Sequence, residues 1–373
     1  MQPPPKPDPQ WQRAGRVLAV RTDNLGDVLM TTPALAAVRH HLPSAQITLL
    51  ASPAGAALAP HLDMVDEVIA HPASWARHER PASALDDMRL VHALAERSYD
   101  AALIFTVCTQ SALPAAMLCR LAGIPLRAAH CRENPYELLT HWLPESDTDV
   151  AHARHEVQRQ LDLTASLGWQ PSDTHLRFAL RPEDGESLAA KLRLAGLPPG
   201  ARWIVVHPGA SAASRRYPAD RFGAAAEAIA QDSGCCVIFT GSAGEQPLVA
   251  LAQQAMRRRS VSLAGALGVG ELAALIAGAQ ALVSNNSGPV HLAAALGTPV
   301  VDLYALTNPQ HTPWQVSARV LNHDVPCRNC LKSVCPQGHH ACLDGVPAEA
   351  VAEAALQLMA APQAGPSPLE VTR

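Results

Sequence analysis

The stretch Ser284-Asn-Asn-Ser-Gly-Pro-Val-His291 separates an apolar run at 279–283 from an apolar helical pattern at 292–296. A second strand pattern follows at 299–303. We therefore expect a strand, a polar turn, a helix and another strand, which is the repeating unit of a parallel sheet covered by helices. The turn lies at the carboxyl edge of that sheet, where open α/β proteins bind their ligands.

The same stretch carries the residue types that a helix start needs. Pro289 suits the first helical position, where a missing N–H is harmless, and Ser287 or Asn286 can cap the exposed amides. Free N–H groups at Gly288 and the positive end of the helix dipole can hold a phosphate. His291 lies about one turn further on, near enough to line the same crevice. A purely structural strand–turn–helix is the alternative interpretation.

The alternation of strand and helix patterns extends through most of the chain. The first series predicts strands at 16–22, 47–51, 67–70, 101–106 and 124–129, and helices at 28–41, 85–97, 112–123 and 150–168. The second series predicts one strand that begins at residue 203 and further strands at 235–240, 261–263 and 281–284. It also predicts helices at 220–231, 244–256, 270–277 and 347–360. The predicted fold class is therefore α/β, with two doubly wound, Rossmann-like domains that face each other across a cleft.

A boundary between the domains is expected where the composition changes. The segment 169–200 is rich in Pro, Asp, Ser and Gly, so we expect a first domain at 15–175, an interdomain region at 176–200 and a second domain at 201–361. The Pro-containing ends, 1–14 and 362–373, are expected to be disordered tails. The first of these lacks the apolar core of a secretion signal.

Composition and charge limit the classes of function. A chain of 373 residues exceeds one ordinary core, and the net charge of −4 gives no electrostatic reason to expect nucleic acid as a partner. The uncharged segment 101–119 contains Thr106, Gln110 and Pro114, so we interpret it as a strand, a loop and a helix, not as a membrane span. We expect a cytoplasmic protein in which most of the nine cysteines are reduced.

The first candidate site residue is Asp27, which ends the run Asn24-Leu-Gly-Asp27 between a strand and its helix. A carboxylate there could act in the crevice between the domains. The alternative is a helix-start carboxylate that serves only the helix dipole.

Two further turns carry candidate ligand-binding residues. His207-Pro-Gly-Ala-Ser211 ends a strand with small residues, and Arg215 and Arg216 follow, of which Arg215 is the better candidate to neutralise a phosphate. Thr240-Gly-Ser-Ala-Gly-Glu245 places Gly241 in a small-residue turn and Glu245 just inside the next helix. Such an acid can hold ribose hydroxyls or can serve only as a helix N-terminal carboxylate.

Other motifs are weaker or missing. Asp147-Thr-Asp149 has the spacing of a metal-binding D-x-D, although Asp149 is more simply interpreted as a helix cap. The sequence contains no G-x-G-x-x-G, Walker A, H-E-x-x-H or G-x-S-x-G pattern, which argues against dehydrogenases, P-loop NTPases, zincins and α/β-hydrolases.

Four cysteines gather near the end of the second series, at Cys327, Cys330, Cys335 and Cys342. This loop, 327–342, could enclose a structural zinc ion, because Cys-x-x-Cys is a common first half of such a site. The spacing of the second half is irregular, so chance thiols in a loop are the alternative. The loop lies past the last predicted strand, and we do not expect it to be catalytic.

Together these motifs resemble glycosyltransferase family 9, the ADP-heptose–lipopolysaccharide heptosyltransferases. The matching pieces are Arg21 to Leu35, His207 to Ser211 with Arg215 to Pro218, Thr240-Gly241 with Glu245, and Ser284 to Leu296. The resemblance implies a GT-B type fold, in which the first domain binds the acceptor and the second binds the nucleotide-sugar. It also implies inversion at the anomeric carbon without a catalytic metal.

The resemblance assigns roles to individual residues. Asp27 would be the general base that takes the proton of the acceptor hydroxyl. Arg215 would neutralise the donor diphosphate, together with amides at the helix start after Ser287. Glu245 would bind the ribose, and Ser211, Gly241, Gly288 and His291 match other positions of the donor site.

Two positions depart from the family pattern, since Asn286 stands where most members have Asp, and Arg215 where they usually have Lys. The predicted function is transfer of a heptose from ADP-heptose to a lipopolysaccharide core or related envelope glycan. The acceptor would be a lipid A–core glycolipid, with peripheral association at the cytoplasmic face of the inner membrane. Because Asn286 supplies no charge, a transferase for another nucleotide-sugar and a non-catalytic binding relative are the alternatives.

Overall fold

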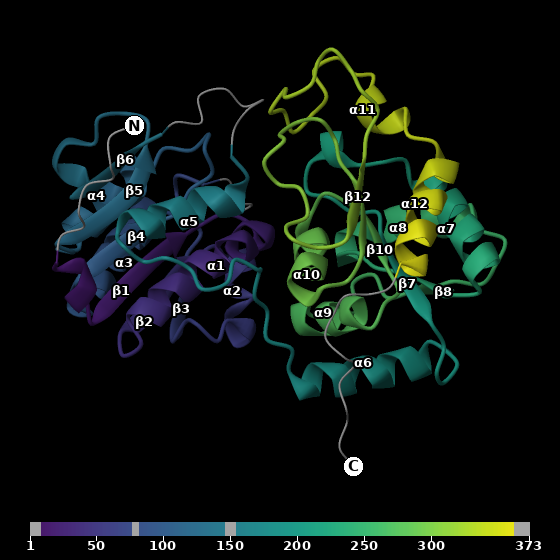
Figure 1. Ribbon diagram of the computed structural model, residues 1–373, viewed down its shortest axis with the longest axis horizontal. Helices are drawn as coiled ribbons and strands as arrows, with labels where there is room; N and C mark the ends of the chain where they lie inside the picture. The colour runs from purple at the N-terminus through teal and green to yellow at the C-terminus, as the bar shows by residue number, and fades with distance from the viewer. Residues whose placement is uncertain (1–8, 77–81, 146–153, 362–373) are drawn as a thin grey trace. The chain divides into compact units, whose positions relative to one another are not determined.

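The computed structural model describes residues 9–76, 82–145 and 154–361. The chain divides into two compact units, residues 1–179 and 180–373 (Figure 1). The D-x-D pattern at 147–149, the start of the predicted helix at 150–168 and the tail at 362–373 lie outside the described residues.

The first unit is built on a six-stranded parallel sheet with the order β3-β2-β1-β4-β5-β6. Its central strands are almost continuously apolar and buried, as expected for a sheet with helices on both faces. Helices α1 and α5 pack against each other, as do α3 and α4 (Figure 1). The strands are β1 (Arg16–Arg21), β2 (Gln46–Ala51), β3 (Glu67–Ala70), β4 (Ala101–Ile104), β5 (Leu126–Cys131) and β6 (His141–Pro144), and the helices are α1 (Leu25–His41), α2 (Pro53–Ala56), α3 (Ala84–Glu96), α4 (Leu113–Leu121) and α5 (Glu156–Ser166).

The second unit repeats the plan with the strand order β12-β11-β10-β7-β8-β9, again all parallel. Helix α7 packs against both α8 and α12, and α9 packs against both α6 and α10. The strands are β7 (Trp203–His207), β8 (Cys236–Phe239), β9 (Val261–Ser262), β10 (Leu282–Asn285), β11 (Val300–Leu303) and β12 (Ala318–Leu321), and the helices are α6 (Pro182–Leu194), α7 (Ala219–Ser233), α8 (Gln246–Gln254), α9 (Val269–Ala277), α10 (Gly288–Leu296), α11 (Ala341–Asp344) and α12 (Ala348–Ala360).

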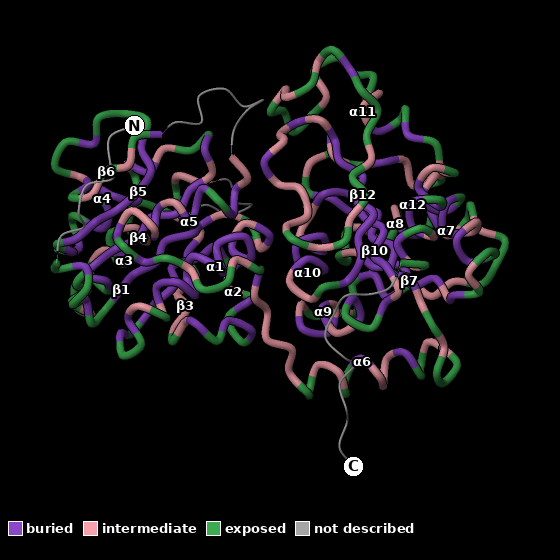
Figure 2. The backbone as a smooth tube through the Cα atoms, viewed as in Figure 1, coloured by how far each residue is buried: buried purple, intermediate pink, exposed green. Residues whose placement is uncertain are grey.

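The α/β fold class with two doubly wound parallel sheets is therefore confirmed. Figure 2 shows the central strands of each unit in purple, because they form the buried cores. In each sheet the strand order reverses beside the first strand, between β1 and β4 and between β7 and β10. Such switch points leave a crevice at the carboxyl ends of the strands, where ligands bind.

Part of the predicted N-terminal tail is folded onto the first unit. Residues Trp11–Arg13 form a 3-10 helix, and Trp11 is only 1% exposed. Its ring lies edge-on to Trp169, with 5.9 Å between the ring centroids. The Gln12 side chain donates to the Leu167 carbonyl oxygen. The prediction of disorder over 1–14 failed for residues 9–14 because a single large apolar side chain outweighs a Pro-rich composition.

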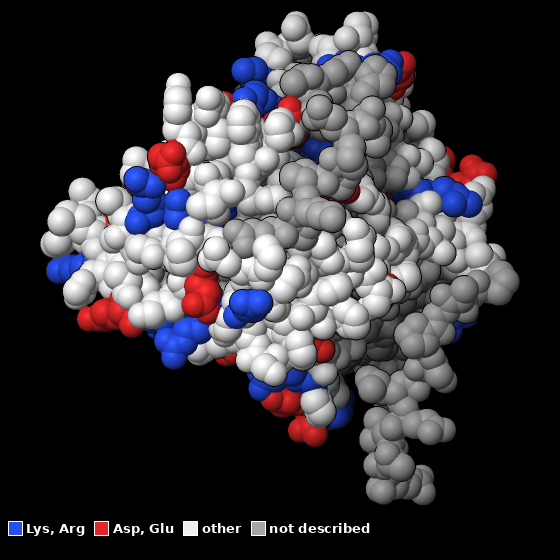
Figure 3. Space-filling model, turned by 60° about the vertical axis from the view of Figure 1, so that its left-hand side comes forward, with Lys and Arg blue, Asp and Glu red and all other residues white. Residues whose placement is uncertain are grey.

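The surface carries charges of both signs. On the face shown in Figure 3, Lys and Arg side chains are interspersed with Asp and Glu among many uncharged residues. Among the described residues, no helix has the length and apolar character that crossing a membrane requires.

Candidate functional site

Asp27 lies in the first turn of α1, directly after β1 and a short loop. The backbone N–H of Asn24 donates to Asp27 Oδ2 at 3.0 Å, which closes a capping box at the helix start. Arg21 Nη2 lies 3.4 Å from the other oxygen, Oδ1, and the side chain keeps 14% exposure. The carboxylate is therefore fixed at both oxygens and still accessible from outside.

Beneath Asp27 lies a buried charge cluster that the sequence did not predict. The Arg21 side chain is fully buried, with Asp23 at 3.1 Å and Glu156 of α5 at 2.9 Å. Burial alone would lower the pKa of Arg21, but the carboxylates of Asp23, Glu156 and Asp27 outweigh it and raise the pKa above its ordinary value. Arg21 is therefore a permanent cation, and it orients Asp27 from the buried side of that carboxylate.

In the second unit, the turn after β7 meets the turn after β8. A Cβ at position 209 would meet the carboxylate of Glu245, which would have to move away to make room for it. Glu245 Oε2 accepts hydrogen bonds from the N–H and hydroxyl of Ser242, at 2.8 and 2.9 Å, and Gly241 lies against its Cβ. Glu245 thus caps its own helix and also lies beside the turn after β7, so both predicted roles remain compatible with its position.

His207, at the end of β7, is buried, and its Nδ1 lies 2.9 Å from Thr240 Oγ1. Burial lowers the pKa of His207 to about 4, although the nearby Glu245 opposes the change. His207 is thus neutral near pH 7 and links the ends of β7 and β8.

Asn285, at the end of β10, ties two of the predicted segments together. Its buried amide donates to the Pro208 carbonyl oxygen at 2.7 Å, and its Oδ1 accepts from the N–H of Tyr217 at 2.9 Å. The turn after β7 and the segment that carries Arg215 are therefore both fixed to the switch point between β7 and β10. Ser211 lies between these two segments and is exposed.

Arg215 and Asn286 line the same pocket, with Tyr304, Thr307, Asn308 and His311 among the other lining residues. Two residues that are 71 positions apart are thus brought together by the sheet. The pocket lies at the carboxyl edge of β10 and β11, where the predicted phosphate site was expected. Its lining combines one cation with several neutral hydrogen-bonding groups.

Helix α10 begins at Gly288, one residue before the predicted first position at Pro289, and neither predicted side chain caps it. The Ser287 hydroxyl donates to the Asn285 carbonyl oxygen, and the Asn286 amide donates to Asp302 Oδ2 at 2.9 Å and to the His311 carbonyl oxygen at 2.8 Å. The prediction of a Ser287 or Asn286 cap is therefore wrong, because both side chains bind acceptors elsewhere. His291 lies within α10 and is 4% exposed.

Asp302 on β11 is the buried acid beside Asn286. Its side chain is fully buried, and burial raises its pKa to about 8, although the hydrogen bond from Asn286 opposes the change. No sequence motif singles out Asp302, because an acid at the end of an apolar strand is ordinary. Asp302 lies beside Asn286 because of the register between β10 and β11, in which Asp302 pairs with Ser284, two residues before Asn286.

The cysteine loop does not form the predicted zinc site. Among the described residues, no group of three or more His, Cys, Asp or Glu side chains is arranged to hold a metal ion. Cys327, Cys330, Cys335 and Cys342 are free thiols, and Cys327 Sγ lies 3.6 Å from His339 Nε2.

The loop instead supports the pocket through its backbone. The N–H groups of Asn329 and Leu331 donate to the carbonyl oxygens of Leu306 and Thr307, at 2.7 and 2.9 Å. The hydroxyl of Ser214, the neighbour of Arg215, donates to the Lys332 carbonyl oxygen at 2.7 Å. These contacts fix both sides of the pocket that Arg215 lines.

Comparison with known proteins gives consistent results. Residues 88–341 match the model of glycosyltransferase family 9 (heptosyltransferase). The chain is 29% identical over 329 residues to lipopolysaccharide heptosyltransferase 1 of Pseudomonas aeruginosa, an alignment that covers 86% of this chain and 87% of the relative.

Two solved structures share the fold of most of the chain. A family 9 glycosyltransferase from Veillonella parvula superposes with a TM-score of 0.76 at 22% identity, over 92% of this chain and 97% of the other. The E. coli ADP-heptose lps heptosyltransferase II gives a TM-score of 0.72 at 23% identity, over 92% and 98%. At these identities the structures support the two-domain GT-B type fold alone.

Proposed function

The chain belongs to glycosyltransferase family 9, the heptosyltransferase family, and we propose that it transfers a heptose from ADP-heptose to a lipopolysaccharide inner-core or related envelope glycan. The names of the relatives support the sugar and the class of acceptor, since they are heptosyltransferases of lipopolysaccharide. The acceptor would be a lipid A–core glycolipid, so we expect the protein to work at the cytoplasmic face of the inner membrane.

The observation that supports this proposal is that Arg215 and Asn286 lie together at the carboxyl edge of β10 and β11, and Asn286 lies two residues before the start of α10. The helix has no side-chain cap; Pro289 has no N–H and the N–H of Val290 donates to the Ser287 carbonyl oxygen, so the N–H of Gly288 and the positive end of the dipole would face an anion. Arg215 adds a full positive charge. These groups would bind the diphosphate of the donor and stabilise the charge that develops when it leaves.

Asp27 would act on the acceptor. One of its oxygens takes the proton of the attacking hydroxyl while the new bond to C1 of the sugar forms and the bond to the diphosphate breaks. Arg21 and the Asn24 N–H hold the carboxylate in one orientation during this step. Such positioning is a normal requirement for a general base.

Nucleotide binding is the first test. Calorimetry of the full chain with ADP, UDP and GDP should show preference for ADP, and Arg215→Ala should weaken ADP binding about tenfold or more, as expected for a charged contact. Arg193→Ala is the matched control, because Arg193 lies on α6 of the same unit and is exposed. Preference for UDP or GDP would favour another donor, consistent with Asn286. Absence of binding by all three nucleotides would refute the proposal.

Turnover is the second test. With ADP-heptose and a lipid A–core acceptor, Asp27→Asn should lower kcat by about 10²–10⁴, the usual contribution of a general base. Binding of ADP should not change in this variant. A variant with normal kcat would exclude Asp27 as the base.

A further inference from the structure

The loop that joins α6 to β7 in the second unit is apolar and exposed. Its sequence is Leu194-Ala-Gly-Leu-Pro-Pro-Gly-Ala201, which contains no polar side chain, and none of these residues is buried. Leu194 is 89% exposed, the highest value among the large apolar side chains of the described residues. A contiguous apolar segment that stays exposed marks a surface for a partner or a membrane.

The backbone of this loop is fixed where it leaves the helix. The N–H groups of Gly196 and Leu197 donate to the carbonyl oxygens of Arg193 and Leu192, both at 3.0 Å. Gly196 has a φ of +75°, the left-handed conformation that commonly ends a helix. The exposed Leu194 side chain therefore lies on an ordered turn at the end of α6.

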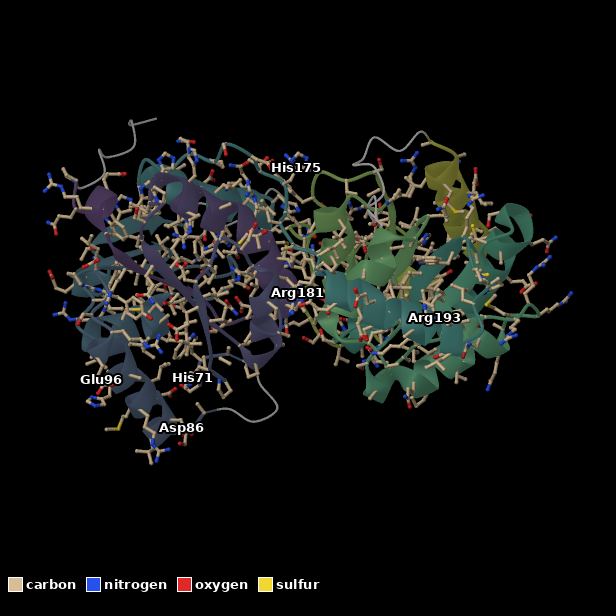
Figure 4. All side chains as sticks on the ribbon, turned by 90° about the horizontal axis from the view of Figure 1, so that it is seen from below. His71, Asp86, Glu96, His175, Arg181 and Arg193 are labelled. Carbon is tan, nitrogen blue, oxygen red and sulfur yellow. The ribbon has the colours of Figure 1, made fainter. Side chains whose placement is uncertain are left out.

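Arginines surround the loop 194–201. Arg193 and Arg202 flank it in the sequence, and Figure 4 labels Arg193, which lies on α6 next to Leu194. The guanidinium group of Arg259 lies over Gly196, since a Cβ added there would be 3.0 Å from Arg259 Nη2. Arg202 directly precedes β7 and the run 257–259 shortly precedes β9, so both lie at the amino-terminal edge of the parallel sheet.

Most of these positive charges have no acid beside them. The segments 191–202 and 255–262 contain three basic residues each and no Asp or Glu, although the whole chain has a net charge of −4. Lys191 pairs with Glu271 at 2.5 Å, and Arg258 Nε lies 3.6 Å from Glu227 Oε1. Within the described part of the chain, no acid forms an ion pair with the four remaining side chains, Arg193, Arg202, Arg257 and Arg259.

The other acids of the neighbouring elements do not cancel this charge. Glu183, Asp184 and Glu186 lie in the first half of α6, and Glu186 is eight residues before Leu194, or about 12 Å along the helix axis. Asp232, near the end of α7, adds one exposed acid at the same edge of the sheet. Four arginines against one acid leave this edge positive.

An anionic lipid surface fits this combination of groups. Its phosphates would meet the arginines while Leu194 reached the boundary of the acyl chains, as in other segments that bind at a membrane interface. A second copy of the chain fits poorly, because a two-fold contact through this loop would bring like charges together. A nucleic acid would neutralise the arginines but would leave the apolar loop without a partner.

We propose that the loop 194–201, with Arg193, Arg202, Arg257 and Arg259 around it, docks the protein on an anionic phospholipid bilayer. The inference rests on the proposed function, for which it names the surface that would hold the transferase beside a lipid-linked acceptor.

Vesicle binding tests the charge requirement. The full chain is mixed with vesicles of phosphatidylcholine alone, or of equal parts phosphatidylcholine and phosphatidylglycerol, and the bound fraction is measured by sedimentation. Each arginine near an anionic surface strengthens binding about fivefold, so the anionic vesicles should bind at least about tenfold more tightly. The difference should shrink in about 0.5 M salt. Equal binding to the two kinds of vesicle would overturn the proposal.

Variants locate the binding on this surface. Arg257→Ser combined with Arg259→Ser should weaken binding to the anionic vesicles about tenfold or more, and Leu194→Ser should weaken it about three- to fivefold. These side chains are exposed, so the variants should fold. Unchanged binding in both variants would overturn the proposal.

Matched controls remove similar groups elsewhere. Arg89→Ser combined with Arg319→Ser removes the same charge from two exposed side chains, and Val320→Ser removes an exposed apolar group from β12. Losses in these controls as large as those in the test variants would contradict a local docking surface. The proposal also fails if polyuridine RNA displaces the protein from anionic vesicles and binds Leu194→Ser as tightly as the wild type, because the arginines would then serve a nucleic acid.

ADP binding, measured by calorimetry on the same variants, separates this inference from the proposed function. The docking variants should bind ADP as the wild type does, because none of the substituted residues lines the pocket of Arg215. If ADP binds and the anionic vesicles do not, the docking inference fails and the transferase proposal stands. If the anionic vesicles bind and ADP, UDP and GDP do not, the transferase proposal fails and the docking surface stands.

Discussion

Asp302→Asn should stabilise the protein, and the gain should grow with pH. The substitution keeps the size of the side chain and an oxygen that can accept the hydrogen bond from Asn286. It removes a carboxyl group that is fully buried and whose second oxygen, Oδ1, has no hydrogen-bond partner among the described residues. Ionisation at that site is costly because no cation compensates the buried charge.

The magnitude follows from the pKa of Asp302, which burial raises from 3.8 to about 8. Since the folded state holds this proton more tightly than the unfolded state, the wild type loses stability as pH rises from about 4 to 8. Each pH unit in this window costs about 1.4 kcal/mol. Between pH 5 and pH 8 the advantage of Asp302→Asn should therefore grow by up to roughly 4 kcal/mol, or about 8–16 °C in Tm.

The assay is thermal and denaturant unfolding of both proteins at pH 5, 6, 7 and 8. The comparison at each pH isolates Asp302, because the buried histidines His130 and His207 are present in both proteins and their contributions cancel. Asp232→Asn is the control, since Asp232 is exposed in the same unit, and it should stay within about 0.5 kcal/mol of the wild type. An advantage that is independent of pH, or that grows towards pH 5, would refute the reasoning.

Three further predictions concern other buried groups. Arg21→Met should lower the free energy of unfolding by about 3–5 kcal/mol because it leaves Glu156 buried without its cation. The double variant with Glu156→Gln should recover part of this loss in a double-mutant cycle of denaturant unfolding. Gly209→Ala should displace the Glu245 carboxylate from its hydrogen bonds with Ser242 and destabilise the protein by about 1 kcal/mol, and in a Glu245→Ala background the same substitution should cost less. His207→Gln should reduce the loss of stability on acidification from pH 6.5 to 4, because burial lowers the pKa of His207 to about 4 and the unfolded state takes up the proton first.

The sequence was sufficient to predict most strands of both sheets because their evidence is local, whereas the edge strands β6 and β12 were not predicted. Runs such as Val17 to Val20 and Ile204 to Val206 are apolar without alternation, which indicates strands buried on both faces. Each run ends in small or polar residues, and each is followed by a helical pattern.

The contacts of the site residues could not be predicted in the same way. Glu156 stabilises Arg21 across 135 positions, and its place on α5 resembles that of any acid in a first helical turn. Trp11 was assigned to a disordered tail because composition alone does not show that one indole is buried.

Asn286 shows why a departure from a family pattern is hard to interpret from sequence. Asn in place of Asp suggests the loss of a negative charge at the donor site, and hence a weaker or altered enzyme. In the structure the amide of Asn286 donates to Asp302, one strand away, and an aspartate at 286 would place two carboxylates side by side in a buried site. With Asp302 in place, Asn is the residue type that can hydrogen-bond to this acid and still line the pocket with Arg215. An acid is therefore still present one strand away from Asn286, although burial raises its pKa to about 8 and disfavours its charged form, so the substitution alone is a poor argument for a non-catalytic relative.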